Sequence, residues 1–85
     1  MRYTVTWDRD AEAELTQLWL DAPDRAAIAA AANAIDRELA VDAERRGEEF
    51  YGDRLLVVRP LCVTFRVLPR DNLVIVRQVS RLAPT

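Results

Sequence analysis

The sequence predicts a two-layer α+β domain with the element order β-α-α-β-β-β, in which an α-hairpin packs on one face of a mainly antiparallel sheet. Three observations support this fold class. An alternating segment opens the chain, two helical patterns follow it, and three strand-like segments fill the last third. With 85 residues, the chain has the size of one domain, so we expect residues 1–85 to share one modest core.

The first two elements are predicted from periodicity and from a capping residue. Residues 2–7 alternate strictly, with Tyr3, Val5 and Trp7 on one face, which predicts a strand. Asp8 is a suitable N-cap for a helix over residues 9–21. The apolar stripe of this helix comprises Ala11, Leu15, Leu18, Trp19 and Ala22. We expect the helix to lie on the sheet, with both tryptophans in the core.

The second helix follows after a short break. Pro23 ends one helix and suits the first turn of the next, so the pattern predicts a helix from about Pro23 to Arg45, with Gly47 as its stop. One face carries Ile28, Ala31, Ala32, Ile35 and Leu39. We interpret this face as core packing, and the alternative is a surface for self-association.

Residues 47–53 are expected to form a loop between two glycines, followed by strands over residues 54–59, 61–68 and 73–80. Pro60 interrupts the chain between the first two of these strands, and residues 69–72 form the turn between the second and the third. The last strand is apolar on both faces, so we place it inside the sheet. Strand parity puts Arg77 and Arg81 on one face, although a shift of one residue would reverse this assignment.

Composition excludes several chemistries. The chain has no histidine and no lysine, which removes Ser-His and Cys-His catalysis, histidine-bound zinc and Schiff-base chemistry. We therefore expect no metal and no cofactor. The net charge of −2 disfavours non-specific nucleic-acid binding. Cys62 stands alone, and no apolar run reaches the roughly 20 residues of a membrane span, so we expect a cytoplasmic protein.

The candidate site residues lie on the sheet face that the helices leave uncovered. Arg59, Arg66, Arg77 and Arg81 are candidates for binding phosphate or carboxylate, because guanidinium groups grip such anions with two hydrogen bonds. The alternative is that they are solvated and paired with nearby acids. Tyr51 is a candidate stacking residue, or a loop residue packed on the domain edge. The catalytic residues are unknown, and Arg59, Arg77 and Arg81 are weak candidates.

The chain resembles the RelE/ParE superfamily, the toxins of bacterial type II toxin-antitoxin systems, which include plasmid-stabilisation proteins. The resemblance covers nearly the whole chain. It is carried by residues 3–7 (YTVTW) leading into an acidic helix, 54–58 (RLLVV), 61–67 (LCVTFRV), and 73–79 (LVIVRQV) followed by Arg81. It implies a microbial-ribonuclease-like sheet and a co-encoded antitoxin that wraps the toxin. It also implies either ribosome-dependent mRNA cleavage or inhibition of DNA gyrase.

Two departures from the family pattern bear on activity. Cys62 stands where these nucleases carry a basic residue early in the middle strand, and four residues without Tyr or His follow Arg81. Cleavage through the RNA 2′-hydroxyl needs a proton acceptor, and arginine is a poor base. The sequence therefore favours a function without catalysis, and the alternative is an endoribonuclease.

Three hypotheses for the function follow from these observations. The first is a toxin that is neutralised by an antitoxin and acts by binding, as a gyrase-directed or degenerate member would. The second is a ribosome-dependent mRNA endoribonuclease of the RelE type. The third is a non-toxic orphan or adaptor domain that binds a peptide or forms a homodimer. None of the three involves a membrane.

Overall fold

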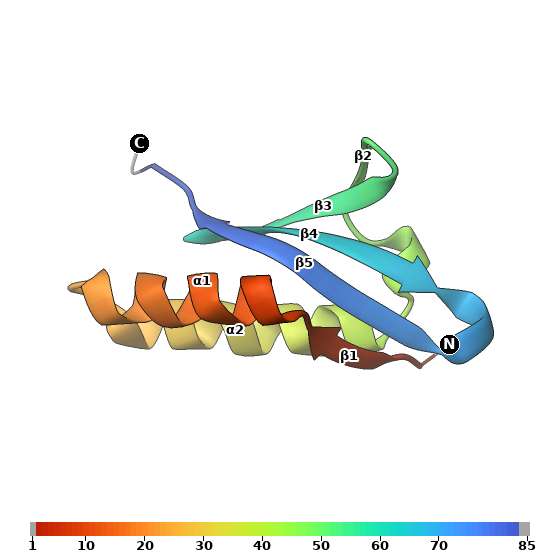
Figure 1. Ribbon diagram of the computed structural model, residues 1–85, viewed down its shortest axis with the longest axis horizontal. Helices are drawn as coiled ribbons and strands as arrows, with labels where there is room; N and C mark the ends of the chain where they lie inside the picture. Colours follow the sequence, from red (N-terminus) through yellow and green to blue (C-terminus); the bar gives the residue numbers. More distant parts are fainter. Residues whose placement is uncertain (1, 84–85) are drawn as a thin grey trace.

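The computed structural model describes residues 2–83 and confirms the predicted α+β fold class. A five-stranded sheet has the order β1-β5-β4-β3-β2, with β1 parallel to β5 and the other pairs antiparallel (Figure 1). The strands are β1 (Thr4–Trp7), β2 (Glu48–Phe50), β3 (Asp53–Val58), β4 (Leu61–Leu68) and β5 (Leu73–Arg81). The helices are α1 (Arg9–Asp21) and α2 (Arg25–Ala40), with short 3₁₀ turns η1 (Ala43–Arg45) and η2 (Pro69–Asp71).

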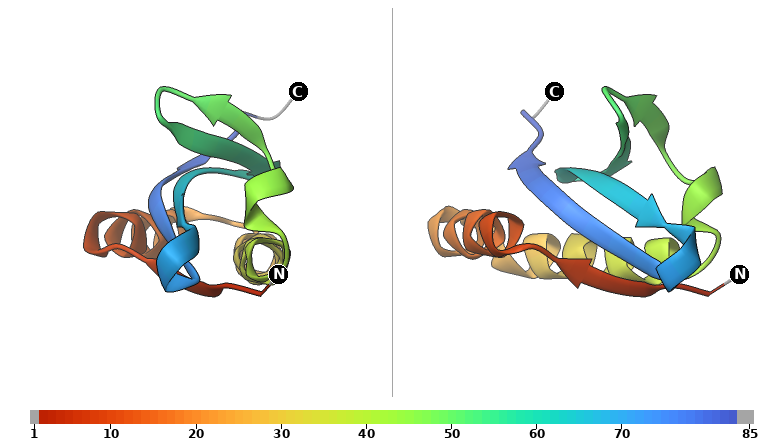
Figure 2. Two further views of the ribbon diagram at one scale, coloured as in Figure 1. Left: turned by 90° about the vertical axis from the view of Figure 1, so that its right-hand side faces the viewer. Right: turned by 45° about the vertical axis from the view of Figure 1, so that its right-hand side comes forward.

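Helix α1 begins at the predicted residue because Asp8 caps it. The Asp8 carboxylate accepts a hydrogen bond from the Ala11 backbone N–H at 2.9 Å. Strand β1 pairs only with residues 73–76 of β5, so beyond Trp7 the chain continues as α1 beside the rest of β5 (Figure 2). Helix α1 therefore lies along an edge of the sheet, and only Ala11 of its apolar stripe is fully buried.

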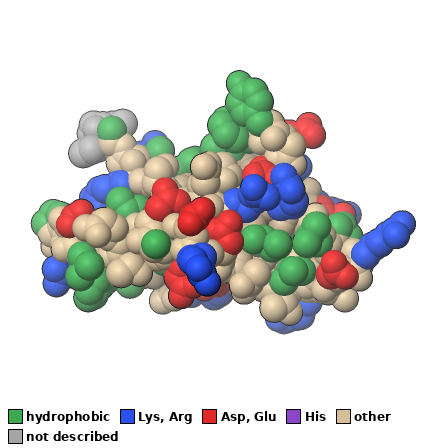
Figure 3. Space-filling view, viewed as in Figure 1, with side chains coloured by type: hydrophobic (Ala, Val, Ile, Leu, Met, Phe, Trp, Pro, Cys, Tyr) green, Lys and Arg blue, Asp and Glu red, His purple; other side chains and the backbone are tan. Residues whose placement is uncertain are grey.

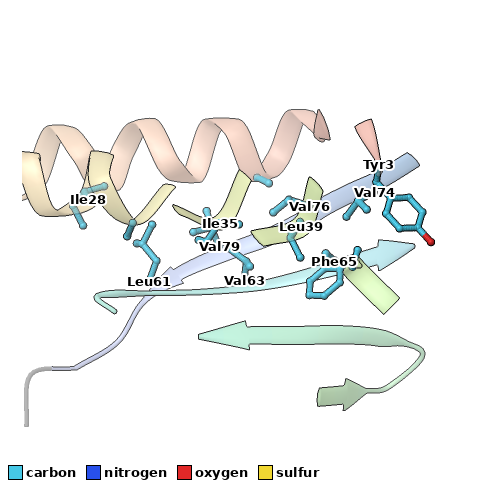
Figure 4. Packing of buried hydrophobic residues seen from close by; sticks show 13 residues of the cluster. Tyr3, Ile28, Ile35, Leu39, Leu61, Val63, Phe65, Val74, Val76 and Val79 are labelled. Atoms are coloured by element: carbon cyan, nitrogen blue, oxygen red, sulfur yellow. The ribbon is translucent and has the colours of Figure 1, made fainter. Parts of the chain in front are cut away.

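The core lies between α2 and the sheet. The predicted apolar face of α2 is confirmed, since Ile28, Ala31, Ile35 and Leu39 are buried. These side chains face the strands β4 and β5 (Figure 4). The strand residues of this core are Leu61, Val63, Phe65, Val74, Val76 and Val79. Within residues 2–83, neither helix has the length and apolar character of a membrane span.

The second helix is shorter than the sequence predicts. It ends at Ala40, whose carbonyl accepts a hydrogen bond from the Tyr3 N–H at 2.8 Å, and Val41 forms a bridge with Arg2. Pairing with the segment before β1 thus removes residues 41–45 from the helix. The prediction that Gly47 ends this helix is therefore wrong. Gly47 instead lies directly before β2, where its positive φ of 68° lets the backbone turn into the strand.

The predicted loop at residues 47–53 is wrong, because residues 48–50 form the strand β2. It pairs antiparallel with β3 through the two-residue turn Tyr51–Gly52. Both turn residues have positive φ, 47° and 87°, which is the backbone of a tight hairpin turn. The Glu-Glu-Phe segment has no strand signal of its own, and pairing with β3 makes it a strand.

A β-bulge in β5 makes the predicted parity of Arg77 and Arg81 wrong. Val76 pairs with Phe65 and Gln78 pairs with Thr64, so Arg77 is an extra residue without a partner on β4. One inserted residue reverses the alternation beyond it. Val74, Val76 and Val79 consequently all face the core. Arg77 lies on the uncovered face of the sheet, whereas Arg81 lies on the side of the helices.

The two tryptophans differ from the prediction that both are core residues. Trp7 is partly buried, and its indole N–H donates to Asp36 at 2.7 Å. Trp19 is 40% exposed, with the Arg25 guanidinium 4.7 Å from its ring centre. Because α1 lies at the sheet edge, the outer part of its apolar stripe has no layer above it. The core prediction is therefore wrong for Trp19.

Candidate functional site

A groove crosses the sheet face that α2 does not cover. It lies between α1 and the β2–β3 hairpin and consists of two adjoining cavities that share Glu14 and Gln78. The larger, of about 600 Å³, is also lined by Asp8, Asp10, Ala13, Asp53 and Arg77. The smaller, of about 310 Å³, is also lined by Phe50, Leu55, Cys62, Thr64, Val79 and Ser80. We call the two cavities together the open-face groove.

Strand register builds the floor of the open-face groove. Leu55 pairs with Thr64 and Thr64 with Gln78, so one row of side chains crosses three strands. Cys62 and Ser80 form the next row. Thr64 is buried although it belongs to the uncovered face, because the hairpin and α1 rise on both sides. The groove is therefore a recess in the sheet face.

Asp53 holds two of the sheet arginines together. Its Oδ1 accepts from Nε of Arg66 at 2.9 Å, and its Oδ2 lies 3.4 Å from Nε of Arg77. The Asp53 side chain is 16% exposed, whereas those of Arg66 and Arg77 are 47% and 44% exposed. Neighbouring strands and the bulge bring the three side chains together, and their combined charge is +1.

Acidic side chains surround this ionic cluster. Four carboxylates and one guanidinium line the larger cavity. Figure 3 shows acidic and basic side chains side by side in the middle of this face, below the protruding hairpin. Because unlike charges attract and like charges repel, this half of the groove favours cationic and neutral hydrogen-bond donors over polyanions.

Apart from the shared Glu14, the smaller cavity is lined by uncharged residues. Thr64 and Ser80 bring hydroxyls, Gln78 brings an amide, and burial raises the pKa of the Cys62 thiol. Cys62 is therefore a protonated thiol at neutral pH and a poor nucleophile. Within residues 2–83, Cys62 and the acidic residues form no group of three or more that is suited to hold a metal ion. This cavity can therefore contribute hydrogen bonds and apolar contacts to a bound partner.

The structure brings together Arg66 and Arg77 among the predicted site residues. Arg59 lies in the β3–β4 turn, and Arg81 donates to Asp24 at the start of α2, at 2.9 Å. Tyr51 is 94% exposed at the hairpin tip, edge-on to Phe50 with ring centres 4.9 Å apart. These three residues lie outside the lining of the groove.

Sequence reasoning missed four residues of the groove lining, namely Glu14, Phe50, Asp53 and Gln78. A signal for Asp53 was present, because Tyr-Gly between two short segments is compatible with a hairpin turn. Asp53 would then be the first residue of a strand and lie beside Arg66. Gln78 follows the bulge, which no local pattern indicates.

The Arg81–Asp24 pair predicts a pH effect on stability. The hydrogen bond from Arg81 holds the pKa of Asp24 below its ordinary value of 3.8. A carboxyl with a lowered folded-state pKa stabilises the fold above its unfolded pKa, and this contribution is lost as the pH falls through the folded pKa. We expect Asp24→Asn to be less stable than the wild type at about pH 7, and the difference to shrink as the pH falls through the lowered pKa of Asp24.

Urea unfolding of both proteins across this range measures the effect. Asp71→Asn, in the exposed turn η2, is the matched control and should follow the wild type at every pH. A difference for Asp24→Asn that stays constant down to the lowest pH would contradict this role of the pair.

Solved structures share the fold of this chain. No family model matches the sequence, and no curated protein matches it. The chain is similar to a chain of the toxin-antitoxin complex RelBE2 from Mycobacterium tuberculosis, at 18% identity and a TM-score of 0.77, covering 99% of this chain and 95% of that one. The chromosomal ParDE toxin-antitoxin system of P. aeruginosa gives 19% identity, a TM-score of 0.66 and coverages of 96% and 98%. The isolated E. coli RelE toxin gives 14% identity, a TM-score of 0.53 and coverages of 98% and 87%.

Proposed function

We propose that this chain, which has the fold of the RelE/ParE toxins, is the toxin component of a bacterial type II toxin-antitoxin system. In this proposal a co-encoded antitoxin neutralises it, and it acts by binding a protein target. Solved chains that match over nearly their whole length belong to a RelBE2 complex and a ParDE system. This likeness supports the class of system, and the groove supports the mode of action.

The observation that carries the binding mode is the charge of the open-face groove. An RNA-cleaving site binds a phosphate chain and therefore needs a surplus of positive charge. Here Asp53 pairs with both arginines of the sheet face, and Asp8, Asp10 and Glu14 add three negative charges at the rim. A protein surface with suitable donors and apolar side chains fits this groove better than RNA does. A gyrase-directed or degenerate toxin is the form of the proposal that follows.

Controlled induction in bacteria tests the proposal. We expect the wild type to arrest growth, and co-expression of the antitoxin from the adjoining reading frame to restore it. The double variant Arg66→Ala/Arg77→Ala should relieve the arrest by about tenfold or more in viable count, because it leaves Asp53 in the groove lining without both of its ionic partners and so disrupts the arrangement of the site. Arg59→Ala/Arg70→Ala removes the same charge outside the groove and should still arrest growth.

Purified protein with translating ribosomes separates binding from nuclease activity. We expect the mRNA to remain intact and, for a gyrase-directed toxin, DNA supercoiling by purified gyrase to be inhibited. Site-specific mRNA cleavage that Arg77→Ala abolishes would instead establish the endoribonuclease alternative. Normal growth with soluble, folded wild-type protein would favour the non-toxic adaptor.

A further inference from the structure

The open-face groove has two chemically different ends. The neutral end lies at Phe50 and Leu55, and the acidic end lies at Asp10 and Asp8, with Glu14 common to both cavities. The groove therefore has a direction, and an occupant must present different side chains to its two ends.

The charge at the acidic end is available to a partner. Asp10 and Glu14 are exposed and have no ion pair within residues 2–83, and the guanidinium that lines the same cavity, that of Arg77, is paired with Asp53. The rim of the groove therefore attracts a cation.

The neutral end suits a large apolar side chain. Phe50 is 42% exposed on β2, and its ring borders a cavity of about 310 Å³ that also contains Leu55 and the rows formed by Cys62, Thr64 and Ser80. Exposed apolar surface in a recess is typical of sites for an anchoring residue. An apolar side chain of a partner that enters this cavity would remove the exposed apolar surface of Phe50 from water.

Building on the binding function proposed above, we infer that the open-face groove binds a peptide segment that carries an arginine or lysine next to a large apolar residue. The basic side chain lies against Asp10 and Glu14, and the apolar side chain enters the cavity under Phe50. Charge complementarity selects this segment over an acidic one, since an acidic side chain at the rim would face Asp8, Asp10 and Glu14 together.

Two synthetic amphipathic peptides of 18 residues test the inference directly. They share the same leucine positions and carry arginine or glutamate, respectively, at the remaining positions. Fluorescence anisotropy with the full chain measures their Kd values at low and high salt. We expect the arginine peptide to bind the wild type about tenfold or more tightly than the glutamate peptide, with the preference decreasing as salt increases.

Matched charge variants separate the groove from the net charge of the protein. Asp10→Asn/Glu14→Gln should weaken binding of the arginine peptide by about tenfold. Glu12→Gln/Asp36→Asn removes two charges from the cavity between α1 and α2, outside the open-face groove, and should leave the affinity unchanged. Phe50→Ala should weaken binding of both peptides.

Three results would overturn the inference: equal binding of the two peptides, tighter binding of the glutamate peptide, or an equal loss in both double variants. The peptide measurement needs neither an antitoxin nor a cellular target. The inference therefore fails on the peptide affinities, whereas the proposed function fails on growth arrest and partner rescue, and each can fail without the other.

Discussion

Phe65→Ala should lower the free energy of unfolding by about 3 to 5 kcal/mol, the usual cost of deleting a buried aromatic ring. Phe65 has no exposed surface, lies in β4, the middle strand of the sheet, and belongs to the buried cluster in Figure 4. Truncation leaves a cavity in the core between the sheet and α2. For a domain of this size, this loss is a large share of the total stability.

Phe50→Ala is the matched control, because it makes the same chemical change at a ring that is 42% exposed. We expect it to cost about 1 kcal/mol or less. Urea denaturation followed by circular dichroism and by tryptophan fluorescence gives both values. Equal losses for the two variants would contradict the burial of Phe65 in the core.

Gly47→Ala should destabilise the protein by about 3 kcal/mol, because two effects combine at this position. The φ of 68° is unfavourable for any residue with a Cβ. A Cβ built here also collides with the backbone carbonyl of Leu55, which belongs to the paired strand β3. Relief requires β2 to move away from β3, and this movement would displace Phe50 from the groove.

Gly52→Ala separates the two effects. Its φ of 87° is equally restrictive, but a Cβ there meets no atom within 4 Å. We expect a loss of about 1 kcal/mol from the backbone conformation alone. Chemical denaturation provides both values, and the Gly47 variant should in addition bind the arginine peptide more weakly. A loss at Gly47 no larger than at Gly52 would contradict the close approach of the two strands.

Arg54 fixes the position of the segment before β2 through two hydrogen bonds. Its guanidinium donates to the carbonyl oxygens of Arg46 at 2.8 Å and Gly47 at 3.0 Å. These bonds tie the turn at residues 46–47 to β3, so a change at Gly47 strains both the strand pairing and this contact. The hairpin wall of the groove depends on them.

Local patterns in the sequence were sufficient for most of the fold. The Asp8 cap, the helix at residues 9–21, the buried stripe of α2 and the strand β4 follow from periodicities of 3.6 and 2 and from a capping preference. Each of these signals lies within one element, which is why a single sequence reveals it. The absence of histidine and lysine, which excludes several catalytic chemistries, is likewise read from the chain directly.

The site depended on contacts between distant segments. The bulge at Arg77 is visible only when β5 is laid against β4, and it decides that Arg77 lies in the groove while Arg81 pairs with Asp24. Strand β2, the early end of α2 and the exposure of Trp19 also arise from pairing and layering across the fold. Residue patterns specify which face of an element is apolar. The register between strands and the covering layer specify where each polar side chain meets another, and these are properties of the assembled sheet.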